Sequence, residues 1–177
     1  VDKDYFALLA KHKEDVVFID VQAVGEDGKV VRDEFLSVYK NLSKDDFMRS
    51  QMTGKINWGG VRKVVKREIK VGEEALFTYS SVFYSKSISF IEKPVYFYIQ
   101  RDDSLSHTKM DDPWGEVALA LKEQTKANGS YSEYADTVNA FILTAAAVSS
   151  DRLASNYGKN EYRQKIEELH TRLKQNL

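Results

Sequence analysis

The feature that most constrains the fold is a short, continuous apolar run at residues 16–19 (Val-Val-Phe-Ile), which follows the charged pair Glu14-Asp15. A run of β-branched and aromatic residues without polar alternation is typical of a strand that is buried on both faces, as in a parallel sheet. The run therefore predicts that the first part of the chain folds as an α/β layer.

Length and composition limit the classes of protein that the chain can belong to. Its 177 residues can bury about two thirds of the unfolded surface, so a stable core needs no disulfides. There are 26 Lys and Arg against 27 Asp and Glu, a balance that argues against a dedicated nucleic-acid binder. Cysteine is absent, which excludes disulfides, thiolate metal sites and cysteine nucleophiles. No apolar run approaches the length of a membrane span, about 18 residues.

Local patterns predict an α/β part over residues 1–110 and a three-helix region over 111–177. Helix signals include Ser43 with Asp46, a weak capping box, and Asp112 before Pro113. In chain order we expect a helix at 3–13, a strand at 16–19, a turn at Asp27-Gly28, a helix from Lys44, a helix at 75–85, strands at 87–91 and 95–100 separated by Pro94, and helices ending near residues 126, 149 and 177.

The three histidines, His12, His107 and His170, lack a second metal-ligating residue at a spacing that one helix face could bring together. Ser104 and Asp103 lie close to His107 in sequence, but a catalytic triad requires side chains that converge from separate segments. We therefore interpret the histidines as surface or boundary residues.

A basic run at residues 62–67 (Arg-Lys-Val-Val-Lys-Arg) follows Trp58 and two glycines. Arg and Lys make charge-assisted hydrogen bonds to phosphate oxygens, and glycine lets the backbone approach a ligand closely. The run is therefore a candidate anion site. The same residues would equally form the solvated face of a helix.

Glu73 and Glu74 follow a glycine at the point where a helix is expected to begin. A carboxylate there can act as a general base on a hydroxyl group within hydrogen-bond reach. It can also simply favour the helix by complementing its dipole. The aromatic stretch at residues 95–99 (Val-Tyr-Phe-Tyr-Ile) has two interpretations as well, strand packing or the floor of a sugar site.

Four segments follow one another in a recognisable order: Gly-Glu-Glu-Ala-Leu-Phe at 72–77, Tyr-Ser-Lys-Ser-Ile at 84–88, Ile-Glu-Lys-Pro-Val-Tyr-Phe-Tyr at 91–98 and Arg-Asp-Asp-Ser-Leu-Ser at 101–106. Together they resemble the second half of bacterial family 2 glycosyltransferases. Members of that family commonly show Gly-Glu-Asp before Leu and Phe, then a Lys-Pro-x-Tyr-x-Tyr strand and an Arg-x-x-Ser-Leu ending. The basic run with Trp58 is similar to their Trp-Gly-Lys-Leu segment, and residues 15–29 are similar to the strand after their metal motif. The resemblance covers about residues 1–110.

The resemblance implies a Rossmann-like nucleotide-sugar-transferase sheet and an inverting transfer of a sugar from a nucleotide-sugar donor to a hydroxyl acceptor. It implies that Glu74 is the catalytic base, at the position of the Asp in Gly-Glu-Asp. Glutamate is one methylene longer, so the geometry of attack would differ. The residues that it implies for substrate binding are Trp58, Arg62, Lys63, Glu73 and Arg101.

The family's nucleotide-binding first half, with its Asp-x-Asp metal motif, has no counterpart in the sequence. We therefore expect an acceptor-side fragment that is inactive alone, with a divalent cation, Mg or Mn, bound only in the complete enzyme. The expected partners are a nucleotide-sugar donor and a glycan or lipid-linked acceptor, but no nucleic acid. The helical tail is a candidate for shaping the acceptor site, for homodimer formation or for contact with a membrane surface.

The expected location is the cytoplasm, at the inner face of the membrane, in the synthesis of capsule or cell-wall polysaccharide. The main alternative is a non-catalytic interaction module with an α/β core and a helical tail. A nucleic-acid-associated protein that uses the basic run is a third interpretation, which the near-neutral charge disfavours.

Overall fold

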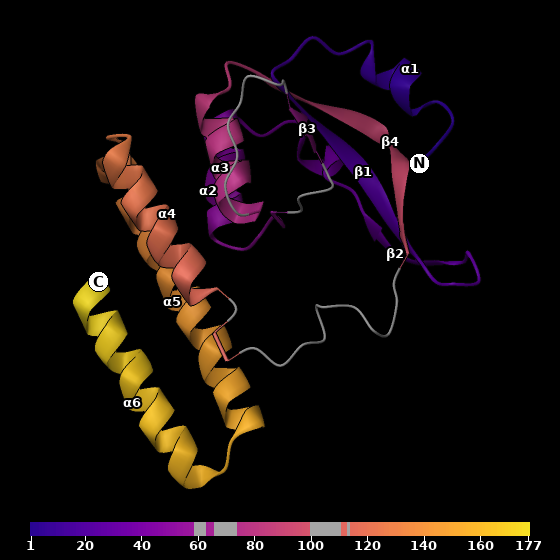
Figure 1. Ribbon diagram of the computed structural model, residues 1–177. Coiled ribbons are helices and arrows are strands. Elements are labelled where there is room, and N and C mark those ends of the chain that lie inside the picture. The colour runs from indigo at the N-terminus through magenta and orange to yellow at the C-terminus, as the bar shows by residue number, and fades with distance from the viewer. Residues whose placement is uncertain (59–62, 66–73, 100–110, 113) are drawn as a thin grey trace. The chain divides into compact units, whose positions relative to one another are not determined.

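The computed structural model describes residues 1–58, 63–65, 74–99, 111–112 and 114–177, of which 63–65 and 74 are described in the backbone alone (Figure 1). The chain divides into two compact units. Unit 1 consists of Val1–Met48 and Ile56–His107, and unit 2 consists of Arg49–Lys55 and Thr108–Leu177. The boundary between His107 and Thr108 falls a few residues before the one expected at residue 110. The assignment of Arg49–Lys55 to unit 2 was not expected.

Unit 1 is built on a four-stranded mixed sheet around the strand β1 (Val16–Val24). β4 (Ile88–Ile99) runs parallel to β1 along its whole length. β2 (Val30–Glu34) and β3 (Lys63–Val65) run antiparallel to β1 on its other edge, β2 beside the second half of the strand and β3 beside the first half. β1 therefore has ladder partners on both edges.

The mixed α/β class is confirmed, but the expectation of a parallel sheet is wrong for two of the three strand pairs. The turn at Asp27-Gly28 explains one of them. Gly28 has a φ of +76°, which glycine adopts readily, and the Gly25 N–H donates to the carbonyl of Lys29 at 2.9 Å. A connection this short reverses the chain and joins antiparallel strands, because a parallel pair needs a long crossover.

β4 is one continuous strand, which corrects the expected separation into two strands at Pro94. Pro94 pairs with Asp20 of β1, and the register between the two strands shifts on both sides of that pair. An irregularity of this kind accommodates a proline, which has no N–H to donate to the ladder. Among the described strands β4 pairs with β1 alone, so Pro94 lies on an edge strand, one of the places where proline is tolerated in a sheet.

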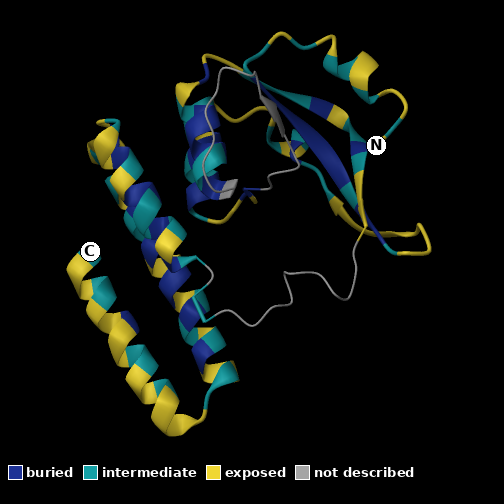
Figure 2. Cartoon of the chain, in the orientation of Figure 1, coloured by how far each residue is buried: buried dark blue, intermediate teal, exposed yellow. Residues whose placement is uncertain are grey.

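Both faces of β1 are buried, as the apolar run predicted (Figure 2). On one face, alternate residues of the strand pack against the helix α1 (Tyr5–Leu9), which is shorter than expected. On the other face, the ring centroid of Phe18 lies 4.7 Å from that of Phe47 in α2 (Lys44–Met52) and 5.5 Å from that of Phe90 in β4. Alternation with a period of two residues sends neighbouring side chains into different layers.

The start of α2 agrees with the sequence analysis, whereas the structure of the basic run does not. α2 begins at Lys44 as expected, because the Ser43 hydroxyl accepts the N–H of Asp46 at 3.0 Å and donates to its carboxylate at 2.7 Å. One of the two alternatives for the basic run at residues 62–67 is the solvated face of a helix. Its residues 63–65 form the strand β3 instead, and its remaining residues lie outside the described part of the chain.

Unit 2 contains the three expected helices, α4 (Gly115–Ala127), α5 (Tyr131–Asn156) and α6 (Lys159–Asn176). α5 continues past the end expected at residue 149. None of the helices in the described part of the chain has the length and apolarity to cross a membrane.

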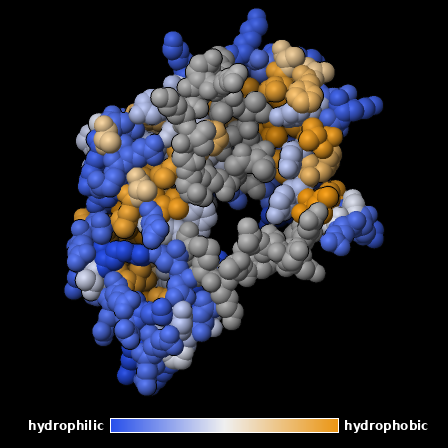
Figure 3. Space-filling view, in the orientation of Figure 1, coloured by the Kyte–Doolittle hydropathy of each residue, from blue (hydrophilic) through white to orange (hydrophobic). Residues whose placement is uncertain are grey.

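α6 is amphipathic and packs on α5 through a narrow apolar strip. Leu169 is buried against Leu153 and Ala146 of α5, and Ile166 and Leu173 flank it on the same helix. Spacings of three and four residues bring these side chains to one face. The face of unit 2 that is visible in Figure 3 is mostly hydrophilic, as expected for the opposite side of such helices.

A buried carboxylate fixes the segment that follows β2. Asp20, in the middle of β1, is only 3% exposed. Its carboxylate accepts the backbone N–H of Ser37 at 2.9 Å and the hydroxyl of the same residue at 2.6 Å. Ser37 begins the short 3₁₀ helix η1 (Ser37–Tyr39). Asp20 therefore holds this segment against the centre of the sheet.

We expect Asp20→Ala to lower the free energy of unfolding by about 2 kcal/mol, because it leaves two donors of Ser37 without their acceptor. Asp33→Ala is the matched control, since this exposed carboxylate accepts a hydrogen bond from Gln22 at 2.8 Å, and it should cost less than about 0.5 kcal/mol. Urea unfolding followed by circular dichroism measures both changes. Equal losses in the two variants would contradict the role of Asp20.

Candidate functional site

Three of the six residues that the resemblance implies lie in the described part of the chain. Trp58 is described in full, whereas Lys63 in β3 and Glu74 in α3 (Glu74–Tyr84) are described in the backbone alone. The other three lie outside the described residues: Arg62, Glu73 and Arg101.

A buried hydrogen bond joins the segment of Trp58 to α3. The hydroxyl of Thr78 donates to the carbonyl oxygen of Trp58 at 3.2 Å. Thr78 is fully buried, and Trp58 is only 5% exposed. Glu74 is the first residue of α3, and positions i and i+4 of a helix share a face. The structure therefore brings the backbone of Trp58 to the face of α3 on which position 74 also lies.

The C-terminal end of α3 is held by a lysine from α2. Lys44 Nζ donates to the carbonyl of Ser85 at 2.7 Å and to that of Phe83 at 3.3 Å. A cation at this end satisfies the last carbonyls and complements the negative end of the helix dipole. α3 is thus anchored near both ends, which determines where its first residue lies within unit 1.

The segment after Trp58 has a second anchor at Lys63. In β3, Lys63 pairs with Phe18 of β1 in antiparallel register. Residues 59–62 therefore connect two fixed points, the carbonyl of Trp58 on α3 and the start of β3 on the sheet. Sequence reasoning named these residues but had no means of finding the anchors.

The aromatic stretch at the end of β4 is divided between core packing and exposed surface. Val95 is fully buried and Tyr96 packs against the core. Phe97 and Tyr98 are 38% and 41% exposed, respectively. The first half of the stretch is therefore core, and the second half leaves aromatic surface at the end of the sheet.

His12 belongs to a small polar cluster that the sequence did not indicate. Its Nδ1 lies 2.8 Å from the hydroxyl of Ser89, and that hydroxyl lies 3.0 Å from the carboxylate of Glu14. The backbone N–H of Glu14 itself, followed by the hydroxyl of Ser89, lowers the pKa of the Glu14 carboxyl through hydrogen bonds. The Ser89 hydroxyl thus donates to Glu14 and also contacts the ring of His12. His170 is exposed, and His107 lies outside the described residues.

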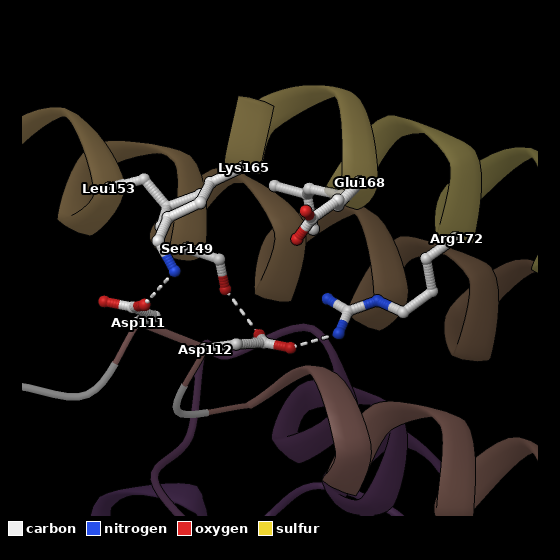
Figure 4. A pocket seen from close by; sticks show the side chains of 8 residues that line it. Asp111, Asp112, Ser149, Leu153, Lys165, Glu168 and Arg172 are labelled. Atoms are coloured by element: carbon white, nitrogen blue, oxygen red, sulfur yellow. Dashed lines mark hydrogen bonds and ion pairs between the residues drawn. The ribbon is translucent and has the colours of Figure 1, made fainter. Parts of the chain in front are cut away.

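Unit 2 contains a cavity of about 300 Å³ that the sequence analysis missed (Figure 4). Its lining combines three carboxylates, two cations, a hydroxyl and two leucines, namely Asp111, Asp112, Glu168, Lys165, Arg172, Ser149, Leu153 and Leu169.

Asp111 connects the segment before α4 to both later helices. Its carboxylate accepts the hydroxyl of Tyr157 at 2.7 Å and pairs with Lys165 at 3.0 Å. The hydrogen bond from Tyr157, together with that from Lys165, holds the pKa of Asp111 below its usual value. The same contacts raise the pKa of Lys165 and of Tyr157. The interacting groups therefore favour the charged carboxylate.

Asp112 binds the first N–H of α4 and pairs with α6. Its carboxylate accepts the N–H of Gly115 at 2.9 Å and the hydroxyl of Ser149 at 2.5 Å, and it forms an ion pair with Arg172. Burial raises the pKa of Asp112, but the hydrogen bonds from Arg172 and Ser149 outweigh it, so that the pKa lies below its usual value. The helix start expected at Asp112-Pro113 is wrong by two residues, because α4 begins at Gly115 with Trp114 as its N-cap residue. Asp112 accepts the first helical N–H from outside the helix and also makes tertiary contacts.

The charged groups of this cavity pair mainly with one another, so the arrangement fastens α6 to the start of α4. Lys165 and Arg172 are seven residues apart, two helical turns, and face Asp111 and Asp112 in turn (Figure 4). The spacing of seven residues between two cations, together with the adjacent pair Asp111 and Asp112, was the sequence signal that could have indicated this network. Within the described ranges, no three side chains of the metal-ligating types gather into a metal site.

Comparisons of the chain with protein families, with characterised proteins and with solved structures return no match.

We expect Gly115→Ala to lower the free energy of unfolding by about 1–3 kcal/mol, because the added Cβ would lie 2.5 Å from Asp112 Oδ1 and 2.6 Å from Arg172 Nη2. Gly158→Ala is the matched control, since nothing lies within 4 Å of its Cβ position, and it should cost less than about 1 kcal/mol. Chemical unfolding followed by circular dichroism compares them. A larger loss in the control would overturn this account of the ion-pair network.

The lowered pKa values of Asp111 and Asp112 predict acid-sensitive attachment of α6. Their stabilisation is present above the ordinary aspartate pKa of about 4 and is lost as the pH falls through the lower folded-state values. Hydrogen-exchange protection of α6 amides should therefore fall below pH 4. The dependence of this protection on pH should become weaker in the double variant Asp111→Asn, Asp112→Asn. It should not change in Glu123→Gln, whose exposed carboxylate pairs with Lys126. An unchanged pH dependence in the double variant would contradict the prediction.

Proposed function

We propose that the chain forms the acceptor-side part of an inverting glycosyltransferase, which transfers a sugar from a nucleotide-sugar donor to a hydroxyl acceptor in bacterial surface-polysaccharide synthesis. The observation that carries the proposal is that Glu74 is the first residue of α3, on the helix face that is bonded to Trp58. The two residues belong to separate motifs of the resemblance and are 16 residues apart in sequence.

The catalytic step assigned to Glu74 is removal of a proton from the acceptor hydroxyl. A hydroxyl group is a weak nucleophile at neutral pH, so a carboxylate within hydrogen-bond reach must take its proton as the oxygen attacks the anomeric carbon. The positive end of a helix stabilises a nearby carboxylate in its ionised form, which is the form that accepts a proton. The start of α3 suits this task.

The leaving nucleoside diphosphate gains negative charge as the bond to the sugar breaks. Cationic side chains stabilise such charge, and Arg62, Lys63 and Arg101 are the residues proposed for this role. The family resemblance also implies a divalent cation, Mg or Mn. The described residues contain no metal-binding group, so we assign the cation to no residue of this chain and derive no step from it.

The sheet of unit 1 is compatible with part of a Rossmann-like domain. β1 and β4 are adjacent and parallel, and α3 lies in the connection between them and ends just before β4. Parallel neighbours joined through a helix are the unit from which such sheets are built. The exposed rings of Phe97 and Tyr98 offer apolar surface for a sugar. This interpretation of the sheet is part of the proposal.

The proposed partners are a nucleotide sugar and a glycan or lipid-linked acceptor, and the proposed location is the cytoplasm at the inner face of the membrane. The proposal includes no nucleic-acid partner. Unit 2 is proposed to serve contact with the membrane surface or with a second copy, since its helices carry none of the residues assigned to catalysis.

In the full-length product of the gene, Glu74→Gln should lower turnover about a hundredfold or more, because the amide accepts no proton. Turnover is measured as release of nucleoside diphosphate from UDP-glucose, UDP-galactose and UDP-N-acetylglucosamine with Mg²⁺ or Mn²⁺ present. Glu74→Asp, which restores the family's usual residue, should retain activity. Glu92→Gln, which changes an exposed carboxylate paired with Lys40, is the matched control and should leave turnover unchanged.

An effect of Glu74→Gln on stability alone, with turnover intact, would show that the residue only favours the helix. Absence of nucleoside diphosphate release from the unmodified protein with every donor would favour the alternative of a non-catalytic interaction module.

A further inference from the structure

We infer that Thr78 is a positioning residue for the proposed reaction, which holds the segment of Trp58 beside the first residue of α3. The inference rests on the proposed function for its catalytic meaning, but its structural part stands on a contact within unit 1. Thr78 is not one of the residues that the resemblance implies.

The first observation is the direction of the Thr78 hydroxyl. Serine and threonine hydroxyls inside helices commonly donate to a carbonyl one turn earlier in the same helix. Ser81 of α3 does so, with its hydroxyl 2.7 Å from the carbonyl of Phe77. Thr78 donates to the carbonyl of Trp58, which belongs to a segment outside the helix. Its hydroxyl therefore makes a tertiary contact.

The second observation is burial. Thr78 and Ser81 are both fully buried, so the two hydroxyls differ in their partner and not in their exposure. Removing a buried donor weakens the attachment of the carbonyl that it binds, so the segment of Trp58 would be held less firmly to α3. Loss of the Thr78 hydroxyl therefore loosens the position of that segment.

The third observation is what the segment connects. It continues from Trp58 to Lys63, which is paired with β1, and Arg62 lies between these two anchors. Thr78 is one helical turn after Glu74. One side chain thus sets the distance between the proposed base and the start of the segment that carries the proposed cations. Misplacement of reacting groups by about 1 Å can lower a rate by about a hundredfold.

The structural arm of the test uses the 177-residue chain with Trp114→Phe, which leaves Trp58 as its one tryptophan. Thr78→Val should shift the emission of Trp58 to longer wavelength and increase its quenching by acrylamide at least twofold. Thr78→Ser retains the hydroxyl and should restore both signals. Ser81→Ala is the matched control and should change neither. An unchanged Trp58 signal in Thr78→Val would overturn the inference.

The functional arm uses the full-length product of the gene, assayed for release of nucleoside diphosphate from the nucleotide sugars named above. Thr78→Val should lower kcat about tenfold to a hundredfold, with the KM for the donor changed less than twofold. Thr78→Ser should recover most of the loss, and Ser81→Ala should keep the unmodified rate. Recovery with serine separates a hydroxyl contact from a general loss of folding.

The two arms distinguish the ways in which the inference can fail. A shifted Trp58 signal with unchanged kcat would overturn the positioning role while leaving the proposed function intact. Absence of turnover in the unmodified full-length protein would overturn the proposed function and with it the catalytic meaning of Thr78. In that case the fluorescence arm would still report whether Thr78 holds the segment of Trp58.

Discussion

Burial of β1 on both faces is the constraint on which unit 1 depends. An apolar strand of this kind needs a layer on each face and a ladder partner on each edge, since every backbone N–H and C=O inside a protein requires a partner. α1 covers one face, the phenylalanine of α2 packs on the other, and β4 occupies one edge along its whole length. The buried carboxylate of Asp20 is tolerated at the centre because Ser37 supplies two hydrogen bonds to it.

The position of α3 follows from this sheet and determines the candidate site. The helix ends just before β4, and Lys44 holds its last carbonyls while Thr78 holds the segment of Trp58 near its beginning. A helix fixed at two points presents its first residue at a defined place, as a catalytic base would require. Glu74 occupies that place. The proposed chemistry thus depends on contacts made by residues that bear no catalytic role.

Unit 2 is organised by a different principle, in which charge and a narrow apolar strip act together. Leu169 supplies the buried part of α6, and the two aspartates before α4 supply its ion pairs. Asp112 also accepts the N–H of Gly115 at the start of α4, so one carboxylate serves the local and the tertiary structure at once. Exposed ion pairs stabilise little when isolated, but a partly buried carboxylate with several donors is more effective.

The sequence by itself determined the features that depend on neighbouring residues: the doubly buried strand, the capped start of α2, the turn at Gly28 and the beginning of α3 at or near Glu74. Each follows from spacing, capping or backbone preference over a few residues. Only the tertiary structure decided the antiparallel partners of β1, the continuity of β4, the bond from Thr78 to Trp58 and the pairing of Asp111 and Asp112 with α6. These contacts join residues that are far apart in sequence, and a local pattern carries no information about which distant partner will satisfy a buried donor or charge.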